Sequence, residues 1–127
     1  MGISKVTDLS FGEMQFITGL MKDICSGKRQ VSVPVKNAIE LLELSGVQSS
    51  MIYESICNSL MNIMNNPVWT GNTYSPLFDE WNVDREFINL TINKDVINNQ
   101  DYSVDYITKI ICNPNKHSFL VKANELE

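Results

Sequence analysis

The chain has 127 residues, of which 43% are hydrophobic and 20% are charged. That length and composition are typical of a folded globular domain, so we expect one domain over residues 1–127. They exclude collagen-like, mucin-like and fully disordered chains. Fifteen acidic residues against ten basic ones give a net charge of −5, whereas dedicated nucleic-acid binders usually carry a basic excess.

Cysteine usage and hydropathy indicate the compartment. Cys25, Cys57 and Cys112 are odd in number and widely spaced, which fits neither a disulfide framework nor a zinc site. Each lies in an apolar helical pattern, so we expect three buried, reduced thiols. No apolar run reaches the roughly 18 residues that span a bilayer, and the N-terminus has no signal-peptide pattern. We therefore expect a cytoplasmic protein without a membrane partner.

The first helix has a clear starting signal. Ser10 and Glu13 have the spacing of a capping box, and apolar residues then recur every three or four positions, which predicts a helix over 11–25. Residues 28–33 carry β-branched side chains at alternate positions before Pro34. We interpret them as a linker, with a brief edge strand as the alternative.

Two more helices are predicted in the first half. One spans 35–45, with Gly46 in the left-handed position that ends a helix. The other has Ser49 or Ser50 as its cap and ends at Asn65, because a proline follows the next residue.

The pattern changes in the second half. Glycine, proline and short polar residues interrupt 68–83, which we interpret as a loop held by large apolar side chains. Strict alternation predicts a strand over 86–92, and a short second strand over 96–97.

The C-terminal part is predicted to contain one helix and one strand. The helix is capped by Ser103 and stopped by Pro114, the strand spans 118–122, and residues 124–127 fray. The predicted fold class is therefore α+β and mainly helical, with an N-terminal three-helix half packed against a small sheet and a fourth helix.

Acidic and aromatic residues gather between Tyr74 and Tyr106, a segment with a strong excess of carboxylates. Aromatic rings anchor protein interfaces and clustered carboxylates attract a basic partner, although the same residues would also suit a core with a soluble face. The predicted partner-binding residues are Phe78, Asp79, Glu80, Trp81 and Asp84.

A helix pair around Gly46 gives the alternative function. Residues 43–52 resemble a helix-turn-helix motif, with Val47 and Ile52 where apolar residues would hold the two helices together. This resemblance implies a DNA-binding transcriptional regulator. The motif usually has a small residue four positions before the glycine, where this chain has Leu42. Residues 50–55 contain no lysine or arginine to contact phosphates or bases. Basic residues that could form a phosphate patch nearby are Lys22, Lys28, Arg29 and Lys36.

Catalytic patterns are weakly represented. The one histidine, His117, is predicted in a turn, and neither the adjacent acidic pairs nor any glycine-rich segment follows a metal-binding or phosphate-binding motif. We predict no enzyme activity, cofactor or metal. The expected function is protein interaction, as a small inhibitor or regulator of another protein with a basic surface. Met51, Met61 and Met64 would add a homodimer contact if they are exposed, although core packing is the default.

Overall fold

The computed structural model describes residues 9–112, which form five helices and five strands. In chain order these are α1 (Phe11–Cys25), β1 (Gln30–Pro34), α2 (Val35–Leu41), α3 (Ser49–Met64), β2 (Val68–Trp69), β3 (Tyr74–Ser75), β4 (Phe78–Val83), β5 (Phe87–Ile92), α4 (Lys94–Asn98) and α5 (Gln100–Cys112). Helical residues outnumber strand residues and the sheets are antiparallel, which confirms the α+β class.

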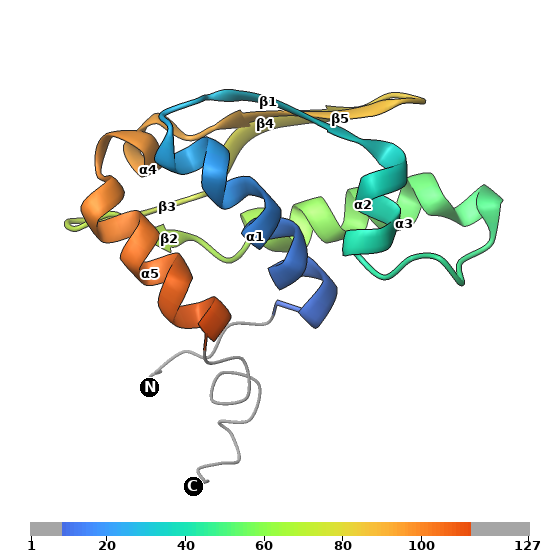
Figure 1. Ribbon diagram of the computed structural model, residues 1–127, viewed down its shortest axis with the longest axis horizontal. Helices are drawn as coiled ribbons and strands as arrows, with labels where there is room; N and C mark the ends of the chain where they lie inside the picture. Colours follow the sequence, from blue (N-terminus) through green and yellow to red (C-terminus); the bar gives the residue numbers. More distant parts are fainter. Residues whose placement is uncertain (1–8, 113–127) are drawn as a thin grey trace, which may run out of the picture.

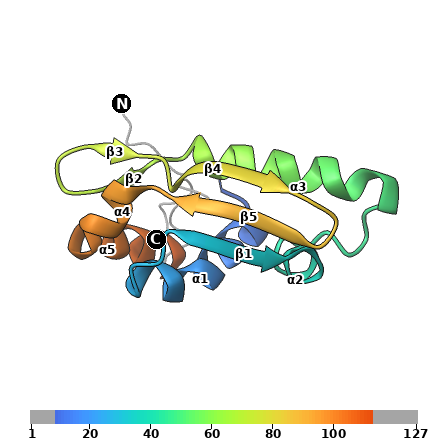
Figure 2. The ribbon, with the colours of Figure 1, turned by 90° about the horizontal axis from the view of Figure 1, so that it is seen from above.

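One face of the main sheet is covered and the other is open. Its three strands run in the order β1-β5-β4, and the helices lie on one side of it (Figure 1). Seen from above, no helix crosses in front of the strands (Figure 2). Side chains on the covered face form the centre of the core, while those on the open face are mostly polar, with Phe87 as an exposed aromatic exception. The short β2-β3 hairpin is a second sheet, and it lies beside α5.

The first helix forms as predicted. The Ser10 hydroxyl accepts a hydrogen bond from the amide of Glu13, and the Glu13 carboxylate accepts one from the amide of Ser10, both at 3.0 Å. These two bonds satisfy amides that the first helical turn leaves without partners. The apolar face of α1 then enters the core through Phe16, Leu20 and Ile24.

The second helix is shorter than predicted. It ends at Leu41, because the amide of Leu44 donates to the carbonyl of Ile39 in the pattern that closes a helix. Glu43 takes the left-handed conformation there, with φ of 60°, and Gly46 does not. The predicted role of Gly46 is therefore wrong: the helix ends four residues earlier, and the left-handed residue is Glu43, a residue type that this conformation disfavours.

A close backbone contact fixes α1 against the end of α2. Gly12 is buried, and a Cβ atom placed on it would lie 2.7 Å from the carbonyl oxygen of Leu42. Only glycine leaves room for this approach. Gly19, on the same helix, would meet Leu41 at 3.5 Å, an ordinary contact distance.

Two segments predicted as irregular form strands. Residues 30–34 form an edge strand, because Val31 and Val33 pack inward when they pair with β5, so the linker interpretation is wrong and the alternative is correct. The predicted loop over 68–83 contains three strands. A β-bulge between Phe78 and Glu80 breaks the alternation of β4, so its inward side chains are not spaced evenly in the sequence.

The region after β5 differs in one element. Residues 96–97, predicted as a strand, lie in helix α4, because the Asn93 side chain accepts from the amide of Asp95 and caps a helical turn. Helix α5 begins at Gln100, and Ser103 lies inside it, where its hydroxyl donates to the carbonyl of Val96 at 2.7 Å. The predicted strand over 118–122, His117, Pro114 and the tail over 124–127 lie outside the described residues.

The third helix begins and ends close to the predicted positions, but Ser49 is its first helical residue and Gln48 precedes it without a side-chain cap.

The predicted burial of the cysteines is wrong. Cys25 and Cys112 are exposed and Cys57 is half-buried, because all three lie beside the apolar face of their helix. All three thiols are free.

Candidate functional site

Strand β4 contains four of the five residues predicted to bind a partner, and Asp84 follows it directly. Phe78 is fully buried and lies opposite Ile92 in the sheet. Its predicted contact role is therefore wrong, because its ring belongs to the core. Trp81 is half-buried, and Asp79, Glu80 and Asp84 are exposed.

The β-bulge brings two carboxylates together on the open face. Phe78 pairs with Ile92 and Glu80 pairs with Thr91, so Asp79 is the extra residue of the bulge. As a result, Asp79 and Glu80 are both exposed although they are consecutive in the chain. We call the exposed carboxylates of Asp79, Glu80, Asp84 and Glu86 the acidic face.

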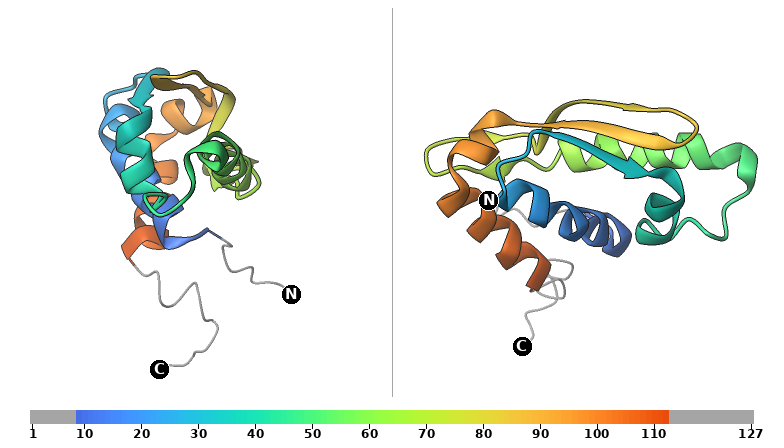
Figure 3. Two further views of the ribbon diagram at one scale, coloured as in Figure 1. Left: turned by 90° about the vertical axis from the view of Figure 1, so that its right-hand side faces the viewer. Right: turned by 45° about the horizontal axis from the view of Figure 1, so that its top comes forward.

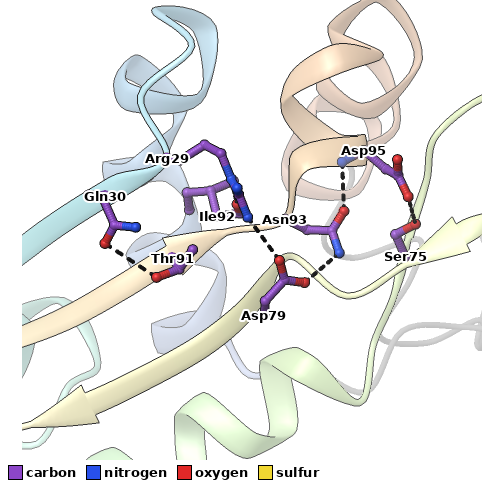
Figure 4. Close-up of polar contacts among 8 residues, drawn as sticks. All are labelled: Arg29, Gln30, Ser75, Asp79, Thr91, Ile92, Asn93 and Asp95. Atoms are coloured by element: carbon purple, nitrogen blue, oxygen red, sulfur yellow. Dashed lines mark hydrogen bonds and ion pairs between the residues drawn. The ribbon is translucent and has the colours of Figure 1, made fainter.

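Asp79 is held by hydrogen bonds that join three elements (Figure 4). Arg29, just before β1, donates from Nη2 to Asp79 Oδ2 at 3.0 Å and from Nε to the carbonyl of Ile92 at 2.8 Å. Asn93, the cap of α4, donates to Asp79 Oδ1 at 2.7 Å. The ion pair is partly exposed, so its contribution to stability is modest. Its geometry nevertheless fixes Asp79 in place.

Asp84 shapes the turn between β4 and β5. Its carboxylate accepts from the amides of Phe87 and Glu86, at 2.7 and 2.8 Å, and from the Asn89 side chain at 3.4 Å. Hydrogen bonds from Phe87, Glu86 and Asn89 favour the ionised form, so the pKa of Asp84 lies below its usual value. Asp84 therefore keeps its negative charge while it holds the turn.

Glu80 is a carboxylate of the acidic face that the fold leaves available. It is exposed, and no hydrogen bond or ion pair joins its side chain to another group within residues 9–112. Its neighbour Trp81 lies on the other face of β4, where the indole Nε1 donates to the Met64 sulfur at 3.1 Å. At this edge of the sheet, the Glu80 carboxylate therefore lies on the open face and the Trp81 ring lies on the covered face.

An apolar stripe on α3 continues from this contact. Tyr53, Cys57, Met61 and Met64 recur at steps of four, four and three, which places them on one face of the helix. Tyr53 is 59% exposed and Met61 is 53% exposed. Tyr53 and Cys57 are neighbours because they lie four positions apart on the helix, and Cys57 raises the pKa of Tyr53 by charge repulsion and by a hydrogen bond. We call these four residues the α3 stripe.

A second surface feature is the aromatic cluster, in which the rings of Trp69, Tyr74 and Tyr106 are in contact and Tyr102 lies against Gly71 of the β2-β3 hairpin. The rings of Trp69 and Tyr74 lie 5.0 Å apart, and Tyr74 meets Tyr106 edge-on at 6.1 Å. Burial, followed by the charge of Tyr74, raises the pKa of Tyr106. Tyr74 and Tyr102 are more than half exposed. The sequence contains these aromatic residues, but their meeting depends on the hairpin packing against α5, which its pattern does not predict.

The segment that resembles a helix-turn-helix has a different geometry. Seven residues, 42–48, separate α2 from α3, whereas the motif uses a turn of three or four. Of the predicted phosphate patch, Arg29 is engaged by Asp79. DNA binding by this segment stays a prediction from the sequence.

Two cavities in the described part of the chain are small or shallow. The pocket between α1, α3 and α5 has a volume of about 20 Å³, room for about one water molecule. A hollow of about 250 Å³ lies along 97–102 and is lined by this one segment. No group of three metal-ligating side chains occurs within residues 9–112, and no helix there could cross a membrane.

Comparisons with protein-family models, with curated proteins and with solved structures give no match for this chain.

Proposed function

We propose that this chain is a non-enzymatic interaction module that inhibits or regulates another protein by binding its basic surface through the acidic face. The observation that carries this proposal is the position of Glu80. Its carboxylate is exposed on a sheet face that no helix covers, next in sequence to Asp79 and on the strand that leads to Asp84, two carboxylates that hydrogen bonds hold in place.

Rigid placement of charge favours association. Asp79 and Asp84 have their orientations fixed by Arg29, Asn93 and the turn amides, so a partner does not have to order them on binding. Glu80 has no competing partner within the described residues, so its charge is available to a lysine or arginine. Such a surface speeds the encounter with a basic protein and selects against acidic ones.

The test is a comparison of two charge reversals. Glu80→Lys places a positive charge on the acidic face, while Glu40→Lys makes the same change at an exposed site on α2. Proteins captured from the native host by the wild-type chain should bind Glu80→Lys at least about tenfold more weakly, because like charges then meet. They should bind Glu40→Lys normally.

Salt provides the second arm of this test. Binding should weaken as ionic strength rises, because exposed charges are screened over roughly 10 Å at 0.1 M salt. If Glu80→Lys and wild type bind the captured protein equally, the acidic face is not the contact surface. If only Glu40→Lys loses binding, the interface lies around α2.

A further inference from the structure

The free edge of β4 has main-chain groups that the sheet does not use. In an antiparallel pair, alternate residues bond to the neighbouring strand and the residues between them direct their N–H and C=O groups the other way. The amide of Asp84 donates to the carbonyl of Phe87 at 2.9 Å. The register with β5 therefore directs the main-chain groups of Trp81 and Val83 outward, and no hydrogen bond joins them to another main-chain group within residues 9–112.

The two edges of the sheet differ in their capacity to accept another strand. On β1, the amide of Val35 donates to Glu86 and the amide of Ile92 donates to Arg29, so Ser32 and Pro34 lie at outward positions. Pro34 has no N–H to donate, which blunts that edge. Strand β4 has no proline, so its edge is the more complete template.

The surroundings of the β4 edge have opposite character above and below the sheet. Helix α3 runs beside β4 in the opposite direction (Figures 2 and 3). Met64 meets Trp81, and the α3 stripe continues from there along the edge through Met61. Glu80 lies on the opposite, open face. A strand added here would have carboxylates beside one set of its side chains and thioether and aromatic groups beside the other.

We propose that the β4 edge binds an extended segment of a partner protein as a fourth strand, with basic residues alternating with apolar ones. This mode rests on the proposed function and specifies its partner. The apolar side chains of the segment lie over Trp81, Met61 and Met64, and its lysine or arginine side chains lie beside Glu80. The main-chain groups of Trp81 and Val83 supply the hydrogen bonds that hold the segment in register.

The probe is a short synthetic peptide, as long as β4, in which lysine alternates with valine. Amide hydrogen exchange of the full chain is measured with and without it. With peptide at about ten times its Kd, exchange at Trp81 and Val83 should slow about tenfold, because those amides exchange only when the site is empty. The amides of Gln30 and Ser32, on the blunted edge, are the matched control and should not change.

Two modified peptides test the hydrogen bonds without altering the protein. Each is N-methylated on alternate residues, one on the set that faces β4 and the other on the set that faces away. The peptide methylated on the set that faces β4 should lose binding, and the peptide methylated on the set that faces away should keep it. Loss by both or by neither overturns strand addition.

The outcomes separate the two proposals. One outcome is that the peptide binds the wild-type chain, binds the Glu80→Gln variant more weakly, and leaves the Trp81 and Val83 amides unprotected. In that case strand addition is wrong and binding through the acidic face stands. Protection at Ser32 instead of β4 also overturns it, as does failure of the peptide to bind at all. If a second copy of this chain protects the same amides at high concentration, the occupant is the chain itself and the proposed basic partner is wrong.

Discussion

Phe78 and Trp81 are three residues apart on β4, and the structure assigns them different roles that mutation can separate. Phe78 is fully buried among core side chains, so Phe78→Ala removes a whole ring from a filled space. Truncations of this kind lower the free energy of unfolding by about 3–5 kcal/mol. Trp81 is half-buried, so Trp81→Ala should lower it by roughly half as much, about 2 kcal/mol.

Urea denaturation measures both values. A domain of this size loses roughly 1–3 kcal/mol of stability per molar urea, so Phe78→Ala should lower the midpoint by about 1 M or more, and by more than Trp81→Ala does. Phe78→Leu, which keeps most of the apolar volume, should fold and bind the partner normally. Trp81→Ala should fold and bind more weakly. The reasoning is refuted if Trp81→Ala is the more destabilising change, or if folded Phe78→Leu loses binding.

Three further predictions concern the backbone and the turn. Gly12→Ala should destabilise the chain by about 1–3 kcal/mol, because the new Cβ atom clashes with the backbone of Leu42. Gly19→Ala should stabilise the chain by up to about 1 kcal/mol, because alanine has the higher helix propensity. Equal urea midpoints for the two variants would contradict the close contact at Gly12. Glu43→Gly should raise the thermal midpoint, because glycine adopts a φ of 60° without strain, and a lower midpoint would contradict that. The lowered pKa of Asp84 adds stability above its unfolded pKa near 3.8, and this stability is lost as pH falls through the folded value. Asp84→Asn should therefore flatten the stability curve below about pH 4 in acid titrations monitored by circular dichroism, and an unchanged curve would oppose it.

Elements with local signals could be predicted from the sequence. The capping box of Ser10 and Glu13 is complete within four residues, so α1 has its predicted bounds. Strand β5 alternates without interruption and is also found within one residue of its predicted start. In both cases the residues that determine the element lie inside it or directly before it.

Elements that depend on tertiary contacts could not be predicted. The strand at β4 was hidden because its bulge shifts the inward side chains from Phe78 to Trp81 by three positions instead of two. The end of α2, where Leu42 and the left-handed Glu43 follow Leu41, lies against Gly12 of another helix, a contact that no pattern within 35–45 contains. Propensity yields to such contacts when the two compete.

The candidate site was predictable in its charge and not in its geometry. The excess of carboxylates is visible in the sequence, and Glu80 and Asp84 are exposed. The sequence does not show that Phe78 turns inward, that Arg29 engages Asp79 from a distant segment, or that β4 has a free edge. These features depend on pairing between strands far apart in the chain.

The most direct test of the central claim is the hydrogen-exchange footprint of this chain in complex with a partner isolated from its host. We expect slowed exchange at the outward amides of Trp81 and Val83, with little change on α2. A footprint confined to the aromatic cluster, or to α2 and the start of α3, would show that the partner binds elsewhere and would contradict the claim.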